Sequence, residues 1–209
     1  MIERRSYQGN IAETNGKLRG LASPTYDGTP GTQYELFDGV VERFAPGAFD
    51  DHLKTSPDVV ALYNHDPSIV LGRTPNTLRL QADATGLHYE VDLPDTTAAR
   101  DLKVSVSRGD IKGSSFAFVP TDVEWTQDGN TDVRLIRGAK VFDVSPVTKP
   151  AYGGSSVGLR SDDERRAIEK ERDEYKAKIN TEKWISKIHS LKNVGWVDTY
   201  GAGSQVNHN

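Results

Sequence analysis

Residues 78–93 read Leu-Arg-Leu-Gln-Ala-Asp-Ala-Thr-Gly-Leu-His-Tyr-Glu-Val-Asp-Leu, and this stretch decides the class of fold. Apolar residues alternate with polar or charged ones on both sides of Gly86. A strict period of two is typical of a half-buried β-strand, and a central glycine suits a tight turn. The stretch therefore predicts a two-stranded hairpin with one face in the core and the other in water.

The same period of two recurs on both sides of this hairpin. A second hairpin is predicted across Gln127-Asp-Gly-Asn130, because apolar residues alternate before the turn, at Val123 and Trp125, and after it, at Val133 and Leu135. Further strands are predicted at residues 17–22, 40–44, 59–63, 111–119 and 139–145. Most of the chain is therefore expected to form short strands joined by turns.

One helix interrupts these strands. It is predicted over residues 97–107, with Thr96 as its N-cap and an apolar face made by Ala99, Leu102 and Val106. A single inserted helix among many strands indicates an α+β fold whose core is a mostly antiparallel sheet or barrel.

The composition changes abruptly at residue 160, where an apolar and glycine-rich sequence gives way to a charged one. Ser161 and Glu164 have the spacing of a capping box, so a charged helix is predicted from Ser161 to about Leu191. Its apolar stripe is sparse, which leaves a solvated helix and a partner-binding helix equally open. We therefore predict a catalytic-sized domain at 1–160 and, at 161–209, a helical extension that ends in a flexible tail.

The overall composition excludes several classes of protein. The formal net charge is -4, whereas proteins that bind nucleic acid generally present a basic surface. The chain has no cysteine, so disulfides, thiolate–metal sites and a cysteine nucleophile are excluded. No apolar run approaches the length that spans a bilayer, and the first residues lack the pattern of a signal peptide. We expect neither a nucleic-acid nor a membrane partner.

Three segments place reactive side chains at strand ends or beside small residues. His65 follows the apolar run 59–63 and precedes Asp66-Pro67, which should break the strand. In the strand at 111–119, Ser114 and Ser115 must face opposite sides, and Ser115 shares its side with small residues while Ser114 shares the side of the phenylalanines. Asp143 lies on the strand at 139–145. Small neighbours would let a substrate backbone approach, so the sequence favours Ser115 over Ser114 as a nucleophile.

These residue types suit nucleophilic catalysis. A serine hydroxyl needs a base to take its proton, and a histidine in that role needs a third group to fix its tautomer. Ser115, His65 and Asp143 would fill the three roles. Other readings stay open, namely a strand-end histidine, a serine in a tight sheet and an aspartate bonded to turn amides.

Four blocks occur in a characteristic order: Phe44-Ala-Pro-Gly-Ala-Phe49, Ala61-Leu-Tyr-Asn-His-Asp-Pro67 with Val70-Leu-Gly-Arg-Thr74, Gly113-Ser-Ser-Phe-Ala-Phe118, and Asp143-Val-Ser-Pro-Val-Thr-Lys-Pro-Ala-Tyr152. In this order the chain, from residue 16 to residue 159, resembles the tailed-bacteriophage (caudovirus) prohead maturation serine proteases. That family is distantly related to the herpesvirus capsid assembly protease. The resemblance implies a β-barrel-like core with surrounding helices.

The resemblance also implies a function and a site. The expected activity is that of a serine endopeptidase that removes the scaffolding segment of the major capsid protein, and cuts itself, inside the assembling procapsid in the host cytoplasm. Self-association is also implied. Neither a cofactor nor a metal ion is expected. By motif position His65 and Ser115 carry the reaction. Asp143 is the expected third member and His88 its rival, because herpesvirus relatives use a second histidine.

Two alternatives to this function remain. The chain could keep the protease fold and act as a non-catalytic capsid-assembly or scaffolding protein through its charged helix. A metal-dependent hydrolase built on His65, His88 and carboxylates is the other, but no ligand spacing supports it. His52, His189 and His208 are expected at the surface, and Arg73 is expected to be structural. Ala117 stands where family members often have glycine.

Overall fold

The computed structural model describes residues 1–9, 11–149 and 162–193. The chain divides into two compact units, Met1–Ala167 and Ile168–Asn209. The first unit holds all the described strands, and the second holds most of the long C-terminal helix. No described helix is both long and apolar enough to cross a membrane.

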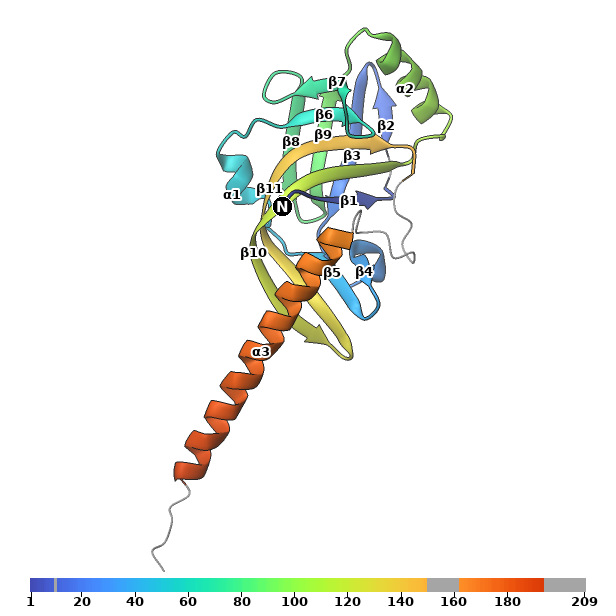
Figure 1. Cartoon of the computed structure of the whole chain (residues 1–209). Coiled ribbons are helices and arrows are strands. Elements are labelled where there is room, and N and C mark those ends of the chain that lie inside the picture. Colours follow the sequence, from blue (N-terminus) through green and yellow to red (C-terminus); the bar gives the residue numbers. More distant parts are fainter. Residues whose placement is uncertain (10, 150–161, 194–209) are drawn as a thin grey trace, which may run out of the picture. The chain divides into compact units, whose positions relative to one another are not determined.

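A seven-stranded sheet forms the main part of the first unit (Figure 1). Its strands follow the order β1-β10-β11-β5-β4, and β6 pairs with both β11 and β7. Pairing is antiparallel except where β11 runs parallel to β5 with one half and to β6 with the other. The bounds are β1 Glu3–Tyr7, β4 Tyr34–Phe37, β5 Val40–Phe44, β6 Val60–Tyr63, β7 Asp66–Arg73, β10 Gly113–Asp128 and β11 Thr131–Val147.

A second, four-stranded antiparallel sheet has the order β2-β3-β9-β8. Its strands are β2 Ala12–Thr14, β3 Lys17–Pro24, β8 Leu78–Asp83 and β9 Gly86–Asp92. β3 lies against β1 and β10, so the two sheets pack together. Among the described residues no strand pairing joins the two sheets, so the barrel-like core consists of two packed sheets and is not a closed barrel. The α+β class and the mostly antiparallel pairing are confirmed.

Of the helices that the structure describes, the last is much longer than the others. The helices are η1 Pro30–Thr32, α1 Asp50–Lys54, α2 Thr97–Ser107 and α3 Asp162–Asn193. α2 begins and ends where the sequence predicts, because the Thr96 side chain accepts a hydrogen bond from the Ala99 amide and Ala99, Leu102 and Val106 are buried. α3 confirms the charged helix, whereas Ser161 of the predicted capping box and the predicted 160/161 domain boundary lie outside the described residues.

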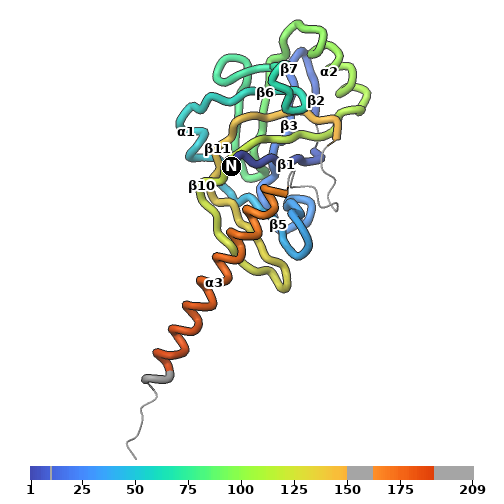
Figure 2. Tube along the Cα trace, in the orientation of Figure 1, coloured from blue at the N-terminus to red at the C-terminus, as the bar shows by residue number. Residues whose placement is uncertain are grey.

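Both predicted hairpins are present. β8 and β9 pair from Leu78↔Val91 to Asp83↔Gly86, and the turn between β10 and β11 is Gly129-Asn130. The strands predicted at 111–119 and 139–145, however, are continuous with this second hairpin. Register shifts after Ala117 and around Asp122 interrupt the alternation along β10, which is why its sequence resembles two strands. β1 was not predicted, and it pairs with β10 although more than a hundred residues separate them (Figure 2).

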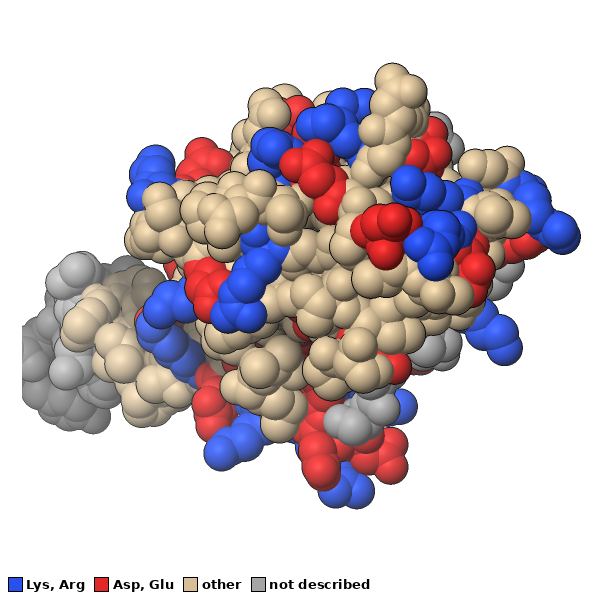
Figure 3. Space-filling view, turned by 90° about the horizontal axis from the view of Figure 1, so that it is seen from above, with Lys and Arg blue, Asp and Glu red and all other residues tan. Residues whose placement is uncertain are grey.

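On the face of the molecule in Figure 3, basic and acidic side chains are interspersed and lie around a broad area of uncharged residues. On the second sheet, Glu90 pairs with Lys17 and Arg19, and Arg79 pairs with Asp92. The polar face predicted for residues 78–93 is thus a lattice of surface ion pairs, each of which contributes little to stability.

An aromatic cluster fills the core beside β10. The ring of Phe44 lies 5.3 to 5.9 Å from those of Tyr34, Phe49, Phe116 and Phe118, and all of these side chains are buried. Such pairs add to the burial of apolar area. Because Phe116 follows Ser115, this cluster fixes which way the strand turns its serine.

We expect Phe44→Ala to lower the free energy of unfolding by about 3–5 kcal/mol, because the substitution leaves a cavity among four packed rings. Urea titration of the variant and the parent chain measures the change. Val104→Ala is the matched control, since Val104 is exposed on α2 and its loss should change stability by no more than about 0.5 kcal/mol. Equal midpoints for the two variants would contradict this account of the core.

Candidate active site

His65 lies in the two-residue turn between β6 and β7, since Tyr63 pairs with Asp66. Asn64 and His65 both have positive φ, at 54° and 58°, as a type I′ hairpin turn requires. Asparagine tolerates a positive φ, but His65 stands where such a turn prefers glycine, so the turn is strained at His65. The surroundings hold it, because the Asn64 amide donates to the Pro146 carbonyl (3.1 Å) and the His65 amide to Ser145 Oγ (3.2 Å). The turn at residues 64–65 thus ends β6, and Pro67 lies inside β7 instead of ending a strand.

Ser115 lies in the middle of three adjacent strands. It pairs with Ser6 of β1 on one side and with Ser145 of β11 on the other, and it is fully buried. Ser114 faces the other side of the sheet, where its hydroxyl lies 3.0 Å from the Tyr89 hydroxyl. Burial raises the pKa of Tyr89, and the hydrogen bond with Ser114 opposes that rise. The predicted opposite orientation of the two serines is therefore observed.

Asp143 of β11 completes the group. The His65 imidazole lies between the other two side chains, with Nδ1 2.5 Å from Asp143 Oδ1 and Nε2 2.6 Å from Ser115 Oγ. The exposed fractions are 8% for both His65 and Asp143 and 0% for Ser115. Three residues that are 50 and 28 positions apart in the chain thus form one continuous line of hydrogen bonds.

Ser145 supports this group, although no sequence argument singled it out. Its hydroxyl donates to Asp143 Oδ1 (3.2 Å) and accepts from the His65 amide, so it fixes both the acid and the strained turn. Because Ser145 stands two residues after Asp143 on one strand, the period of two already placed them on the same face. This shared face is the signal in the sequence that could have pointed to Ser145.

His88 is not part of the group. Its Nε2 lies 2.7 Å from Thr85 Oγ1 and 3.2 Å from Asp83 Oδ1 in the turn between β8 and β9. Asp83 has its pKa lowered to about 2, first by the hydrogen bond from the Thr85 side chain. The rival third member therefore lies on β9 of the other sheet and contacts the turn that precedes it.

The remaining basic residues singled out from sequence lie apart from the group. Arg73 makes an exposed, bidentate ion pair with Asp58, so its predicted structural role fits. His52 lies at the surface as predicted but is half-buried, and its Nε2 lies 3.0 Å from the Val141 carbonyl. His189 is exposed, and His208 lies outside the described residues. Among residues 1–9, 11–149 and 162–193, no group of three or more His, Cys, Asp or Glu side chains could hold a metal ion.

A buried hydroxyl, an imidazole and a carboxylate in this order have the geometry that activates a serine. The carboxylate orients the ring through Nδ1, and the free Nε2 can take the hydroxyl proton. The proton positions follow from the hydrogen-bond partners and are assigned on that basis.

Comparisons with known proteins point to one family. The family model of the caudovirus prohead serine proteases matches residues 12–170. Among solved structures, the bacteriophage T4 capsid assembly protease, gp21, is similar with a TM-score of 0.45 and 11% identity, over 72% of this chain and 97% of that one. No curated protein matches. Because the family model spans well over half of the sequence, the chain belongs to the caudovirus prohead serine protease family and is a phage prohead protease.

Proposed function

We propose that the chain is a serine endopeptidase with Ser115 as nucleophile, His65 as general base and Asp143 as the acid that orients His65. The observation that carries this proposal is the unbroken line of hydrogen bonds from Asp143 through His65 to Ser115. Each member comes from a different element, and few structural needs would bring these three side chains together in a buried place.

The reaction follows from the two ends of the imidazole. His65 Nε2 takes the proton of Ser115 while Oγ attacks the carbonyl carbon of the scissile peptide. The imidazolium, stabilised by Asp143, then protonates the leaving nitrogen as the C–N bond breaks, which leaves an acyl ester on Ser115. A water molecule gives a proton to His65 and attacks the ester carbon. His65 then returns this proton to Ser115 Oγ as the acyl C–O bond breaks, which releases the second product as an acid and restores the free serine and the neutral imidazole.

The proposed substrate is the scaffolding segment of the major capsid protein, and a further substrate is the protease itself. Family membership supports a role with capsid and scaffold proteins, and the finer assignment is our inference from that role. We place the reaction inside the assembling procapsid in the host cytoplasm, with self-association of the protease.

Co-expression with a capsid protein that carries its scaffolding segment tests this function. We expect the parent chain to trim the capsid protein, as seen by intact mass, and Ser115→Ala to leave it whole. Ser114→Ala is the matched control and should still cut, because Ser114 faces the other side of the sheet. Trimming by Ser115→Ala would refute the assignment of the nucleophile. Normal capsids without trimming by any chain would favour the non-catalytic scaffolding role.

A further inference from the structure

The N-terminal strand β1 occupies the edge of β10 beside Ser115. Arg5, Ser6 and Tyr7 pair with Phe116, Ser115 and Ser114, while β11 takes the other edge of β10. An extended peptide commonly binds by adding a strand to a free edge, where backbone hydrogen bonds hold it in register. At Ser115 both edges of β10 are already paired, so no such edge is free.

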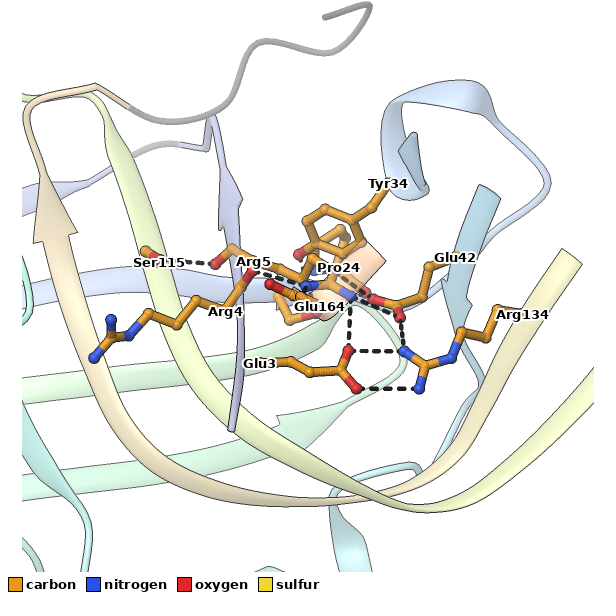
Figure 4. Close-up of polar contacts among 10 residues, drawn as sticks. Glu3, Arg4, Arg5, Pro24, Tyr34, Glu42, Ser115, Arg134 and Glu164 are labelled. Carbon is orange, nitrogen blue, oxygen red and sulfur yellow. Dashed lines mark hydrogen bonds and ion pairs between the residues drawn. The ribbon is translucent and has the colours of Figure 1, made fainter. Parts of the chain in front are cut away.

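The backbone of β1 also contacts the proposed nucleophile directly. Ser115 Oγ donates a hydrogen bond to the Arg5 carbonyl oxygen at 2.9 Å, as Figure 4 shows. A serine hydroxyl has one hydrogen, so a proton given to Arg5 is withheld from His65 Nε2. The contact therefore competes for the proton that the base has to take.

The same contact explains why β1 can lie in this place without being cut there. Attack requires Oγ to approach the carbonyl carbon, whereas in this hydrogen bond Oγ faces the carbonyl oxygen of Arg5. β1 thus presents an extended backbone and a carbonyl group beside Ser115 in an orientation that suits binding and not cleavage.

A buried ion network holds β1 in position (Figure 4). The fully buried Arg5 guanidinium contacts Glu42 (2.7 Å), Glu3 (2.8 Å) and Glu164 (2.6 Å). Arg134 contacts the same Glu3 and Glu42 at 2.7 and 2.8 Å. We call these five residues the Arg5 network. It joins β1 to β5, to β11 and to the first turn of α3.

The buried carboxylates of the Arg5 network need the positive charge of Arg5. Burial alone lowers the pKa of Arg5, but the carboxylates of Glu42, Glu3 and Glu164 outweigh it and raise the pKa. Burial raises the pKa of Glu42, and Arg5 and Arg134 oppose that rise. Without the planar fork of Arg5, carboxylates would be left in the core with a single guanidinium. The release of β1 therefore costs free energy.

We propose that β1 is a self-inhibitory strand, held by the Arg5 network, that occupies the place of the substrate beside Ser115 and must leave β10 before a peptide is cut. This inference rests on the proposed function of Ser115. It adds a regulatory step, the release of β1, before the first cleavage.

A reversible lock tests the proposal on one molecule. Tyr7 and Ser114 are direct partners in an antiparallel pair, where Cα atoms lie about 4.5–5.5 Å apart, a separation that a disulfide spans. The chain has no cysteine of its own, so the double variant Tyr7→Cys/Ser114→Cys can form one bridge only. Both positions lie on the sheet face opposite His65, and the reduced form controls for the substitutions themselves.

Two rates measure the effect of the disulfide: the rate at which a fluorophosphonate labels Ser115 and the rate at which the capsid protein is trimmed. We expect both rates to be at least about tenfold lower in the oxidised form than in the reduced form, because the bridge keeps β1 on β10. The labelling and trimming rates of the single variant Tyr7→Cys should be the same before and after treatment with the same oxidant. Equal and measurable rates in the two forms would overturn the proposal and leave the function of Ser115 intact.

A second variant loosens the strand instead of locking it. Arg5→Lys keeps the positive charge in the Arg5 network but loses the fork that reaches Glu42 and Glu164 together. Labelling of Ser115 should rise at least about tenfold, since the open fraction sets the rate. A rate no higher than that of the parent chain would count against the network as the holder of β1. If neither the parent chain nor any variant is labelled at Ser115 or trims the capsid protein, both the proposed function and the proposed inhibition are contradicted.

Discussion

His65→Ala, Ser115→Ala and the double variant are each expected to lower kcat for capsid-protein cleavage by about 10⁶-fold, with no further loss in the double variant. The base and the nucleophile act in one step, because His65 Nε2 lies 2.6 Å from Ser115 Oγ and takes its proton. When either is missing the proton transfer is gone, and removing the other then costs nothing more. Single-turnover cleavage followed by intact mass measures all three rates.

The strained turn at His65 calls for a second substitution there. Because φ at His65 is 58°, alanine there is strained as well, whereas asparagine tolerates this left-handed conformation. His65→Asn should therefore fold like the parent chain and be as inactive as His65→Ala. His88→Ala is the matched control and should keep full activity, since His88 lies on β9 of the second sheet and contacts Asp83 instead of Asp143. Additive losses in the double variant would contradict a shared catalytic step.

Asp143→Asn is expected to lower kcat by about 10⁴-fold while the chain keeps its fold. The Asp143 carboxylate accepts a hydrogen bond from His65 Nδ1 over 2.5 Å, which leaves Nε2 free to take a proton. An amide nitrogen at that place donates to Nδ1 instead and stabilises the opposite tautomer, whose Nε2 carries a hydrogen and cannot act as a base.

The chain offers a matched control for this variant in its other aspartate–histidine pair. Asp83→Asn changes the partner of His88 in the same way, 3.2 Å from its Nε2, and should leave kcat unchanged. Cleavage rates of both variants, compared after each is shown to unfold at the parent urea concentration, separate catalysis from stability. If kcat of Asp143→Asn fell by less than tenfold, Asp143 would support the turn at residues 64–65 and not the reaction.

Local patterns account for the parts of the fold that were predictable. The hairpin of β8 and β9 follows from strict alternation around Gly86, and α2 follows from the Thr96 cap and one apolar face. Each pattern needs only residues that are neighbours in the chain. The prediction for Pro67 was wrong because the turn at residues 64–65, stabilised by β11, ends β6 before the proline is reached.

For the candidate site, sequence motifs pointed to the three residues that the structure brings together, and the period of two predicted the faces of the strand residues. Ser115 was separated from Ser114 by strand alternation, and His65 and Asp143 were picked out by the blocks that resemble the prohead proteases. Whether Asp143 or His88 was the third member stayed open, since both lie on strands and neither is a sequence neighbour of His65.

What the sequence by itself determined is therefore the set of elements, the family and the residue types available for chemistry, because periodicity, caps and motifs are local. The tertiary structure alone decided that Asp143 meets His65, that Ser145 steadies both, and that β1 lies beside Ser115 with Arg5 in a buried network. These contacts join residues that are up to 159 positions apart. They arise from strand pairing and burial, which depend on how the whole chain packs and leave no signal in any short stretch.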